Sequence, residues 1–433
     1  MPLPLLPTLD ELLDPQTQPA PIRAAAAAST DPLDPIHLFN ISWRRTGSIP
    51  HVLLPPAMTG VKANILVMSA RHFPTGSHKV GPAYSVLREK LLHGEITQDG
   101  STLVFPSTGN YGIGGAWVGP RAGFRSLVVL PEDMSAERFE KIEQYGARVI
   151  KTPGSESNVK EIYDAVKVLR TQPENRILNQ FEEFGNYRFH YHVTGNSALA
   201  MAAEHGDGRV AAFVSAMGSA GTIAAADRIK AAFADSKTVG VEPVQCPTLY
   251  NVGYGAHAIE GIGDKHVTWI HNVRAQDLLC CIDDEACLLG LQLIQEGDLP
   301  ELLPLKDLLG VSGVCNVLAA IKTARHYELK EGQNIVTVAT DAFDRYPSVL
   351  ERLRARRGPP TQGLELFHGV DADWIQEGTM EVRRRWHNQK YFTWVEQQGK
   401  SVAELNALWD PAFWQEQAAR IPELDRQTLE LRR

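Results

Sequence analysis

One segment of the sequence places a lysine where its amine can do chemistry. Pro74–Lys79 is a run of small, turn-forming residues that ends in Lys79, and the residues after it are expected to begin a helix. A lysine in a partly desolvated pocket has a lowered pKa, so its amine can attack a carbonyl and form an imine. Most lysines are solvated surface charges, so the local sequence alone does not mark Lys79 as catalytic.

Two further segments lie where a predicted strand gives way to a predicted helix. In Pro106–Gly112, the hydroxyls of Ser107 and Thr108 and the backbone amides can cradle a carboxylate. In Met217–Thr222, glycines let the backbone approach a phosphate, and the dipole of the following helix favours the anion. Taken singly, each is equally consistent with a capped turn that binds no ligand.

The elements that must position these segments alternate between strands and helices. Helices are expected after Asn110 and over Ser135–Tyr145. The apolar, β-branched runs predict strands at 103–105, 127–130, 147–151, 177–179, 210–215, 238–241 and 335–339. Repeated β-α units imply parallel sheets, and this number of units is enough for two α/β domains with a cleft between them.

Composition excludes several classes of protein. A net charge of -8 and a pI near 6.0 argue against nucleic acid as a partner. No apolar run is long enough to span a bilayer, and the N-terminus lacks a signal-peptide pattern. The odd number of cysteines and their spacing favour neither disulfides nor a metal site, so we expect a cytoplasmic protein; they are Cys246, Cys280, Cys281, Cys287 and Cys315.

Taken together, the three segments resemble the cysteine synthase and tryptophan synthase β-subunit superfamily of pyridoxal-phosphate (PLP) enzymes, known as fold type II. In that family a lysine carries PLP as a Schiff base, a Ser/Thr-Gly-Asn loop binds the substrate carboxylate, and a glycine-rich loop binds the PLP phosphate. The resemblance covers roughly residues 50–350 and includes Val129–Ser135 and Gly240–Pro243. It implies that Lys79 is the catalytic lysine.

The resemblance also implies roles for other residues. Asn110 would contact the phenolic oxygen of PLP, His78 could donate to its phosphate, and Glu260 could hydrogen-bond the substrate or leaving group or be structural. The expected cofactor-binding set is His78, Lys79, Asn110, Gly218, Ser219, Ala220, Gly221, Thr222, Thr340 and Asp341. The expected substrate-binding set is Ser107, Thr108, Gly109, Asn110, Tyr111 and Glu260, with no metal ligand.

One position departs from the family pattern. Where the family places a serine or threonine hydroxyl against the pyridine nitrogen, this sequence has Asp341, with Thr340 one residue before it. A carboxylate would keep the nitrogen protonated and make PLP a stronger electron sink than a hydroxyl would. The sequence leaves open which of the two side chains faces the ring.

The expected fold class is therefore α/β, with two open twisted parallel-sheet domains that carry helices on both faces and a helical C-terminal extension. We expect a flexible N-terminal arm at 1–36, which is rich in proline and alanine. Residues 37–100 and 190–350 would form the large PLP-binding domain, and 101–189 a small mobile domain. The tryptophan-rich residues 351–433 would form the extension, packing on the main body or on a partner.

The chemistry implied by the resemblance begins when the substrate amine displaces Lys79 to form an external aldimine, which frees the lysine amine to remove the α-proton. Loss of a β-substituent then gives an aminoacrylate. We therefore expect β-elimination or β-replacement on a β-substituted L-amino acid, such as serine, an O-acylserine or a cysteine derivative, by a homodimer. The alternatives are dehydration or γ-chemistry on a threonine-like substrate, and a PLP-binding regulatory protein without turnover.

Overall fold

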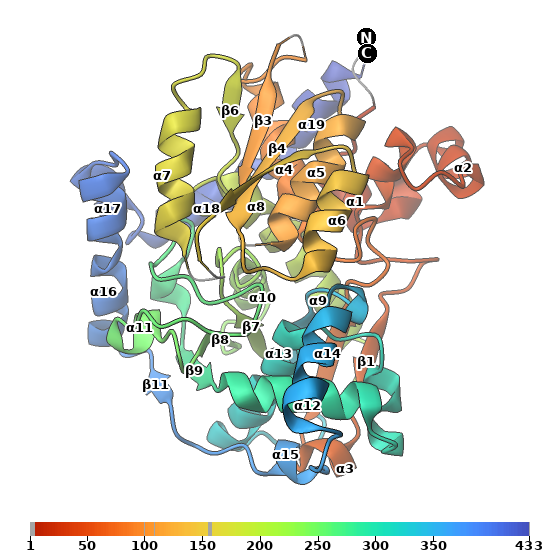
Figure 1. Ribbon diagram of the computed structural model, residues 1–433, viewed down its shortest axis with the longest axis vertical. Helices are drawn as coiled ribbons and strands as arrows, with labels where there is room; N and C mark the ends of the chain where they lie inside the picture. The colour runs from red at the N-terminus through yellow and green to blue at the C-terminus, as the bar shows by residue number, and fades with distance from the viewer. Residues whose placement is uncertain (1–4, 99, 108, 155–157, 433) are drawn as a thin grey trace.

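The computed structural model describes residues 5–98, 100–107, 109–154 and 158–432. They form two β-sheets surrounded by helices, and the C-terminal part of the chain lies along the outside of both (Figure 1). Among the described residues, no helix is both long enough and apolar enough to cross a membrane. The expected α/β architecture with two sheets and a helical C-terminal extension is confirmed.

The larger sheet has seven strands in the order β1-β2-β10-β7-β8-β9-β11. Its inner strands are parallel, and the edge strands β1 and β11 are antiparallel to their neighbours. The strands expected near 210–215, 238–241 and 335–339 are present, whereas β1, β2, β9 and β11 were not predicted. The bounds are β1 His51–Leu53, β2 Asn64–Ser69, β7 Val210–Ala216, β8 Lys237–Pro243, β9 Leu278–Ile282, β10 Asn334–Ala339 and β11 Ile375–Glu377.

The smaller sheet is entirely parallel, with strands in the order β5-β4-β3-β6. All four strands lie close to their predicted positions, although the last begins and ends two residues earlier than expected. The bounds are β3 Thr102–Pro106, β4 Arg125–Pro131, β5 Arg148–Thr152 and β6 Asn175–Ile177. The helices expected after Asn110 and over 135–145 are α5 and α6.

Helices cover both sheets and extend beyond them (Figure 1). In the first half of the chain they are α1 Leu9–Leu13, α2 Ala20–Ala28, α3 Pro56–Thr59, α4 Val80–Leu92, α5 Asn110–Arg121, α6 Ala136–Gln144, α7 Val159–Leu169, α8 Phe184–Phe189 and α9 Gly195–Ala202. In the second half they are α10 Ala224–Ala232, α11 Thr248–Asn251, α12 Asp284–Glu296, α13 Val311–His326, α14 Pro347–Arg357, α15 Glu365–His368, α16 Met380–Asn388, α17 Val402–Ala407, α18 Pro411–Ala419 and α19 Ile421–Leu431.

The N-terminal segment differs from the flexible arm that its composition predicts. Within its described part, Thr8 caps α1 in a reciprocal capping box, and Leu9 and Leu12 are completely buried. The backbone amides of Leu9 and Asp10 each donate to the Asp425 carboxylate of α19, at 3.0 Å. The segment is therefore fixed to the far end of the chain, a contact that composition cannot reveal.

The C-terminal extension packs on the body of the same chain. Trp394 is fully buried, and its indole nitrogen donates to the carbonyl oxygen of Val267 at 2.8 Å. Trp386 and Trp414 are also buried, each in a cluster with residues of the body. The extension was expected to be helical throughout. It also contains β11, a short edge strand that pairs with β9 of the larger sheet.

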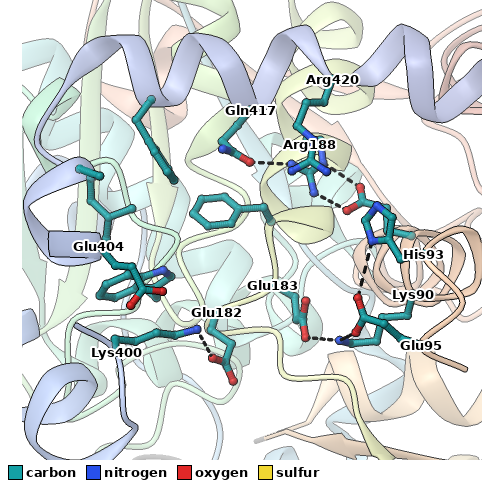
Figure 2. A pocket seen from close by; sticks show the side chains of 16 residues that line it. Lys90, His93, Glu95, Glu182, Glu183, Arg188, Lys400, Glu404, Gln417 and Arg420 are labelled. Atoms are coloured by element: carbon teal, nitrogen blue, oxygen red, sulfur yellow. Dashed lines mark hydrogen bonds and ion pairs between the residues drawn. The ribbon is translucent and has the colours of Figure 1, made fainter. Parts of the chain in front are cut away.

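A cavity of about 440 Å³ lies between the extension and the body. Figure 2 shows one ion pair and one hydrogen bond that cross this junction, while other charged side chains pair within the body. Arg188 of α8 contacts Glu89 and also donates to Gln417 of α18 at 2.7 Å, while Lys400 pairs with Glu182 at 2.9 Å. The Lys400–Glu182 ion pair and the Arg188–Gln417 hydrogen bond attach the extension to the body.

We expect Asp425→Ala to lower the free energy of unfolding by about 3–5 kcal/mol, as removal of one partner of a buried ion pair typically does. Asp425 pairs with the completely buried Arg88 of α4 at 2.6 Å, besides capping α1. Urea unfolding followed by circular dichroism measures the change. Glu423→Ala on the same helix is the control, because its ion pair with Arg426 is exposed and its loss should leave the transition unchanged. Equal urea midpoints for Asp425→Ala and Glu423→Ala would contradict a stabilising role of the Asp425–Arg88 ion pair.

Candidate active site

Lys79 stands half-buried at the N-cap of α4, beyond the carboxyl end of β2 in the larger sheet. Its Nζ lies 3.4 Å from the Oγ of Ser219, which belongs to the glycine-rich loop. Ser77 anchors the lysine segment, because its hydroxyl donates to the carbonyl oxygen of Thr340 at 2.8 Å. The lysine, the glycine-rich loop and the end of β10 therefore meet, as the sequence predicts.

The glycine-rich loop presents a set of backbone donors. None of the N–H groups from Gly218 to Thr222 donates a hydrogen bond to another residue that the structure describes. Ala220 has a left-handed backbone with φ of 58°, and α10 begins two residues after the loop. Converging amides at a helix N-terminus form a site for an anion such as a phosphate.

Asn186 of α8 supports this loop from behind. Its Nδ2 donates to the Ser219 hydroxyl at 3.0 Å, and the Cβ of an alanine at position 221 would lie 1.9 Å from its Oδ1. Gly221 is required because no side chain fits between the loop and Asn186. Asn186 was not predicted, because nothing in its local pattern distinguishes it from a surface asparagine.

His78 is completely buried between two polar groups of the site. Its Nδ1 lies 3.0 Å from the carbonyl oxygen of Thr340, and its Nε2 lies 2.9 Å from the hydroxyl of Thr222. Burial lowers the pKa of His78 to about 3, so the ring is neutral. Because a carbonyl only accepts, Nδ1 carries the proton and Nε2 accepts from Thr222. The ring thus orients Thr222 and has no second proton to donate to a phosphate, contrary to the expectation.

The predicted carboxylate loop is shaped by one of its own hydroxyls. Ser107 Oγ accepts from the backbone amides of Gly109 and Gly112, both at 2.9 Å, so it caps the start of α5. Thr108, a predicted ligand, lies outside the described residues. The side chain of Tyr111 does not line the loop as expected, because it is buried in the hydrophobic core and its hydroxyl donates to the carbonyl oxygen of Leu178 at 3.1 Å.

Asp341 and Asn110 meet at the carboxyl end of β10. The Nδ2 of Asn110 donates to Asp341 Oδ2 at 2.6 Å, and the Tyr346 hydroxyl donates to the same oxygen at 2.8 Å. Oδ1 of Asp341 is buried and has no hydrogen-bond partner among the described residues. The neighbouring Thr340 hydroxyl already pairs with Ser312 Oγ at 2.6 Å. Of Asp341 and Thr340, only Asp341 therefore has a buried oxygen that accepts no hydrogen bond from the described residues.

Arg138 of α6 links the two sheets at this point and was not predicted. Its guanidinium is completely buried and donates to Glu260 Oε2 at 2.6 Å, to Asn110 Oδ1 at 3.2 Å and to the Tyr346 hydroxyl at 3.0 Å. Arg138 thus brings Glu260 next to Asn110, while the substrate-binding role of Glu260 stays a prediction. A sequence signal existed, since Arg138 and the buried Ile142 share one face of an amphipathic helix.

Comparison with known proteins places this geometry in a family. A family model described as "Pyridoxal-phosphate dependent enzyme" matches residues 44–341. The chain belongs to this family. The match includes the lysine segment, the carboxylate loop, the glycine-rich loop and the Asp341 position.

Relatives of this PLP-dependent enzyme are cysteine synthase-like. It is 28% identical over 305 residues to a cysteine synthase of Staphylococcus aureus (strain Mu50), covering 70% of this chain and 93% of the relative. It is 31% identical over 278 residues to a probable cysteine synthase of Bacillus subtilis (strain 168), covering 64% and 85%.

Solved structures agree on the fold. An O-acetylserine dependent cystathionine β-synthase from Helicobacter pylori superposes with a TM-score of 0.61 at 26% identity, covering 69% of this chain and 94% of that one. A cysteine synthase from Entamoeba histolytica superposes with a TM-score of 0.63 at 23% identity, covering 74% and 92%. The chain is a fold type II PLP enzyme, and the family match leaves residues before 44 and after 341 outside it.

The residues present fit PLP. The amide-lined loop after β7 fits the phosphate, and the half-buried amine of Lys79 beside it fits a Schiff-base lysine. The unpartnered Oδ1 of Asp341 supplies a buried acceptor at the strand end where the family holds the pyridine nitrogen. The cofactor is PLP.

We expect Gly221→Ala to weaken PLP binding at least about tenfold, equivalent to about 1.4 kcal/mol, because the new methyl group must displace Asn186 from Ser219. Titration of the apoenzyme with PLP, followed by absorbance, measures the affinity. The double variant Gly221→Ala/Asn186→Ala removes the clash, so its affinity should be no lower than that of Asn186→Ala alone. Fully additive losses would show that the two residues act separately.

Proposed function

We propose that this enzyme catalyses β-elimination or β-replacement on a β-substituted L-amino acid, such as serine, an O-acylserine or a cysteine derivative. The observation that carries the proposal is that Lys79 lies beside the amide-lined loop at Ser219, while the end of β10 holds both the lysine segment and Asn110. The names of its relatives, which include cysteine synthases and an O-acetylserine dependent cystathionine β-synthase, support this reaction class.

The bound cofactor supplies an electron sink that acidifies the C–H bond at the substrate α-carbon. Lys79 is the base that takes this proton, because its amine is half-buried and lies at the centre of the converging loops. The backbone amides around Gly109 and Asn110, at the start of α5, bind the substrate carboxylate. This fixes the α-carbon relative to Lys79, so the chain's own contribution is orientation and proton transfer.

We assign the partner of the pyridine nitrogen to Asp341 rather than to Thr340. The assignment is supported by the unpartnered Oδ1 of Asp341 and by the bond that occupies the Thr340 hydroxyl. Asn110 and Tyr346 both donate to Oδ2 of Asp341, and this fixes the direction in which Oδ1 points. A fixed carboxylate favours a protonated ring nitrogen and so a more acidic α-C–H.

We further propose that residues 101–189 move as a small domain against the large domain of 37–100 and 190–350. Three contacts from α6 cross between them: Arg138 with Glu260, Glu137 with the backbone amide of Ser348 at 2.8 Å, and Lys141 with Asp344 at 2.9 Å. We take the arrangement with these contacts made as the closed one. Closure excludes water, and this favours replacement of the β-substituent over hydrolysis.

We propose that the enzyme acts as a cytoplasmic homodimer. The proposal rests on the resemblance to a family that is usually dimeric and on the five cysteines, which are all buried free thiols. Sedimentation equilibrium of the purified enzyme measures the assembly state. A monomer at micromolar concentration would contradict the dimer.

The reaction class is tested by incubating the holoenzyme with a panel of L-amino acids that includes serine, O-acetylserine, cysteine and threonine. We expect pyruvate and ammonia from at least one β-substituted substrate and, when a thiol is added, a thioether or cysteine product in place of pyruvate. Turnover of threonine alone would favour the dehydratase, and inertness toward every member would favour a regulatory PLP-binding protein.

Asp341→Asn should slow α-proton exchange by about 10²–10⁴-fold, while Thr340→Val should slow it far less, because only the carboxylate sets the protonation of the ring nitrogen. Loss of the substrate α-proton signal in D₂O, followed by NMR, measures the step without product release. The PLP absorbance of each variant confirms that cofactor is bound. A larger effect from Thr340→Val would reverse the assignment.

A further inference from the structure

Asp264 is a buried carboxyl group that the family resemblance did not identify. Its side chain is only 5% exposed, and neither Oδ1 nor Oδ2 has a hydrogen-bond partner among the described residues. Such burial is costly for a polar group and is unusual unless the group has a function. Asp264 is the only residue in the described chain whose two carboxylate oxygens are both buried and without any hydrogen bond or ion pair.

Other buried carboxyl groups nearby show what a structural role looks like. Glu242 accepts the backbone amide of Leu249 with both oxygens, at 2.9 and 3.0 Å. Asp227 accepts from the Tyr187 hydroxyl and from Asn272, each at 2.8 Å. Both groups hold neighbouring segments in place. The Asp264 carboxylate holds no neighbouring segment in place, so a structural role of this kind does not account for its burial.

The position of Asp264 is defined by the loop that carries it. This loop begins at Glu260, which pairs with Arg138, and Gly263 donates from its amide to the carbonyl oxygen of Met217 at 2.8 Å. A Cβ built on Gly261 would lie 3.9 Å from Asn110 Nδ2, and one built on Gly218 would lie 3.7 Å from Asp264 Oδ2. The loop therefore runs along the cleft from the asparagine to the phosphate loop.

The charge environment of Asp264 suits a group that exchanges protons. Burial raises its pKa to about 7, and the positive charge of Lys79 opposes this rise. An acid with a pKa near the working pH is present in both forms and can give or take a proton efficiently. The titratable or charged groups around it are Lys79, Tyr163, Glu242, Cys246, Lys265, His266 and His271.

We propose that Asp264 is a catalytic acid and base for the substituent on the substrate β-carbon. The proposal rests on the reaction class proposed above. In elimination, the α-proton passes to the Lys79 amine, the bond from the β-carbon to the leaving heteroatom breaks, and that heteroatom takes the proton of Asp264. In replacement, the incoming thiol gives its proton to the Asp264 carboxylate as the new bond to the β-carbon forms. Lys79 and Asp264 thus act on adjacent carbons.

A comparison of leaving groups tests this role in the holoenzyme. Serine and cysteine need a proton on the departing oxygen or sulfur, whereas O-acetylserine releases acetate, which needs none. Asp264→Asn should lower pyruvate release from serine or cysteine about 100-fold or more while leaving that from O-acetylserine nearly unchanged. Glu242→Gln is the control, because it makes the same carboxylate-to-amide change at another buried residue of this region. It should leave the ratio of pyruvate release from serine or cysteine to that from O-acetylserine as in the wild type.

A second measurement does not depend on turnover. Because the pKa of Asp264 in the folded protein is above its usual value of 3.8, the folded state holds this proton until pH 7, and Asp264 makes the protein less stable as pH rises from about 4 to 7. The thermal midpoint of holoenzyme should fall less over this range for Asp264→Asn than for the wild type.

The outcomes separate the two proposals. A wild type that releases pyruvate from no substrate overturns the reaction class and the role of Asp264 together. An active wild type in which Asp264→Asn slows all substrates equally, with its PLP absorbance intact, leaves the reaction class standing and overturns the role of Asp264. A thermal midpoint with the same pH dependence in both proteins would also count against it, since Asp264 would then not hold a proton near neutral pH.

Discussion

The active site depends on the register of three parallel strands. β2 pairs with β10 so that Ser69 lies opposite Ala339, and β7 pairs with the other side of β10. Because parallel strands end at the same edge, the lysine segment after β2, the glycine-rich loop after β7 and Asp341 after β10 must converge there. A shift of one residue in this register would turn every side chain on a strand to the opposite face of the sheet.

A buried arginine then connects this edge to the smaller sheet. Arg138 donates to Glu260, Asn110 and Tyr346, so one side chain holds the carboxylate loop, the loop that begins at Glu260 and the segment after β10. A guanidinium is suited to this because its donors lie in one rigid plane. Its charge is compensated by Glu260, which makes burial possible.

The two ends of the chain support the helix that begins at Lys79. Near the far end of α4, Arg88 pairs with Asp425 of α19, and Glu89 pairs with Arg188 of α8, which also reaches the C-terminal extension through Gln417. The same α8 carries the asparagine that supports Ser219. Residues outside the family match, Asp425 and Gln417, thus brace the lysine helix and α8, which carries Asn186.

The sequence by itself determined the local elements and their order. Apolar runs predicted most strands, and short motifs located Lys79, the carboxylate loop and the glycine-rich loop, because turn residues and helix starts depend on neighbours in the chain. Only the tertiary structure decided which groups meet. It showed Asp341 with an unused buried oxygen, turned Tyr111 into the core, and placed Asp264 without a partner beside the phosphate loop. Such facts depend on burial and on contacts between distant segments, which no local pattern encodes.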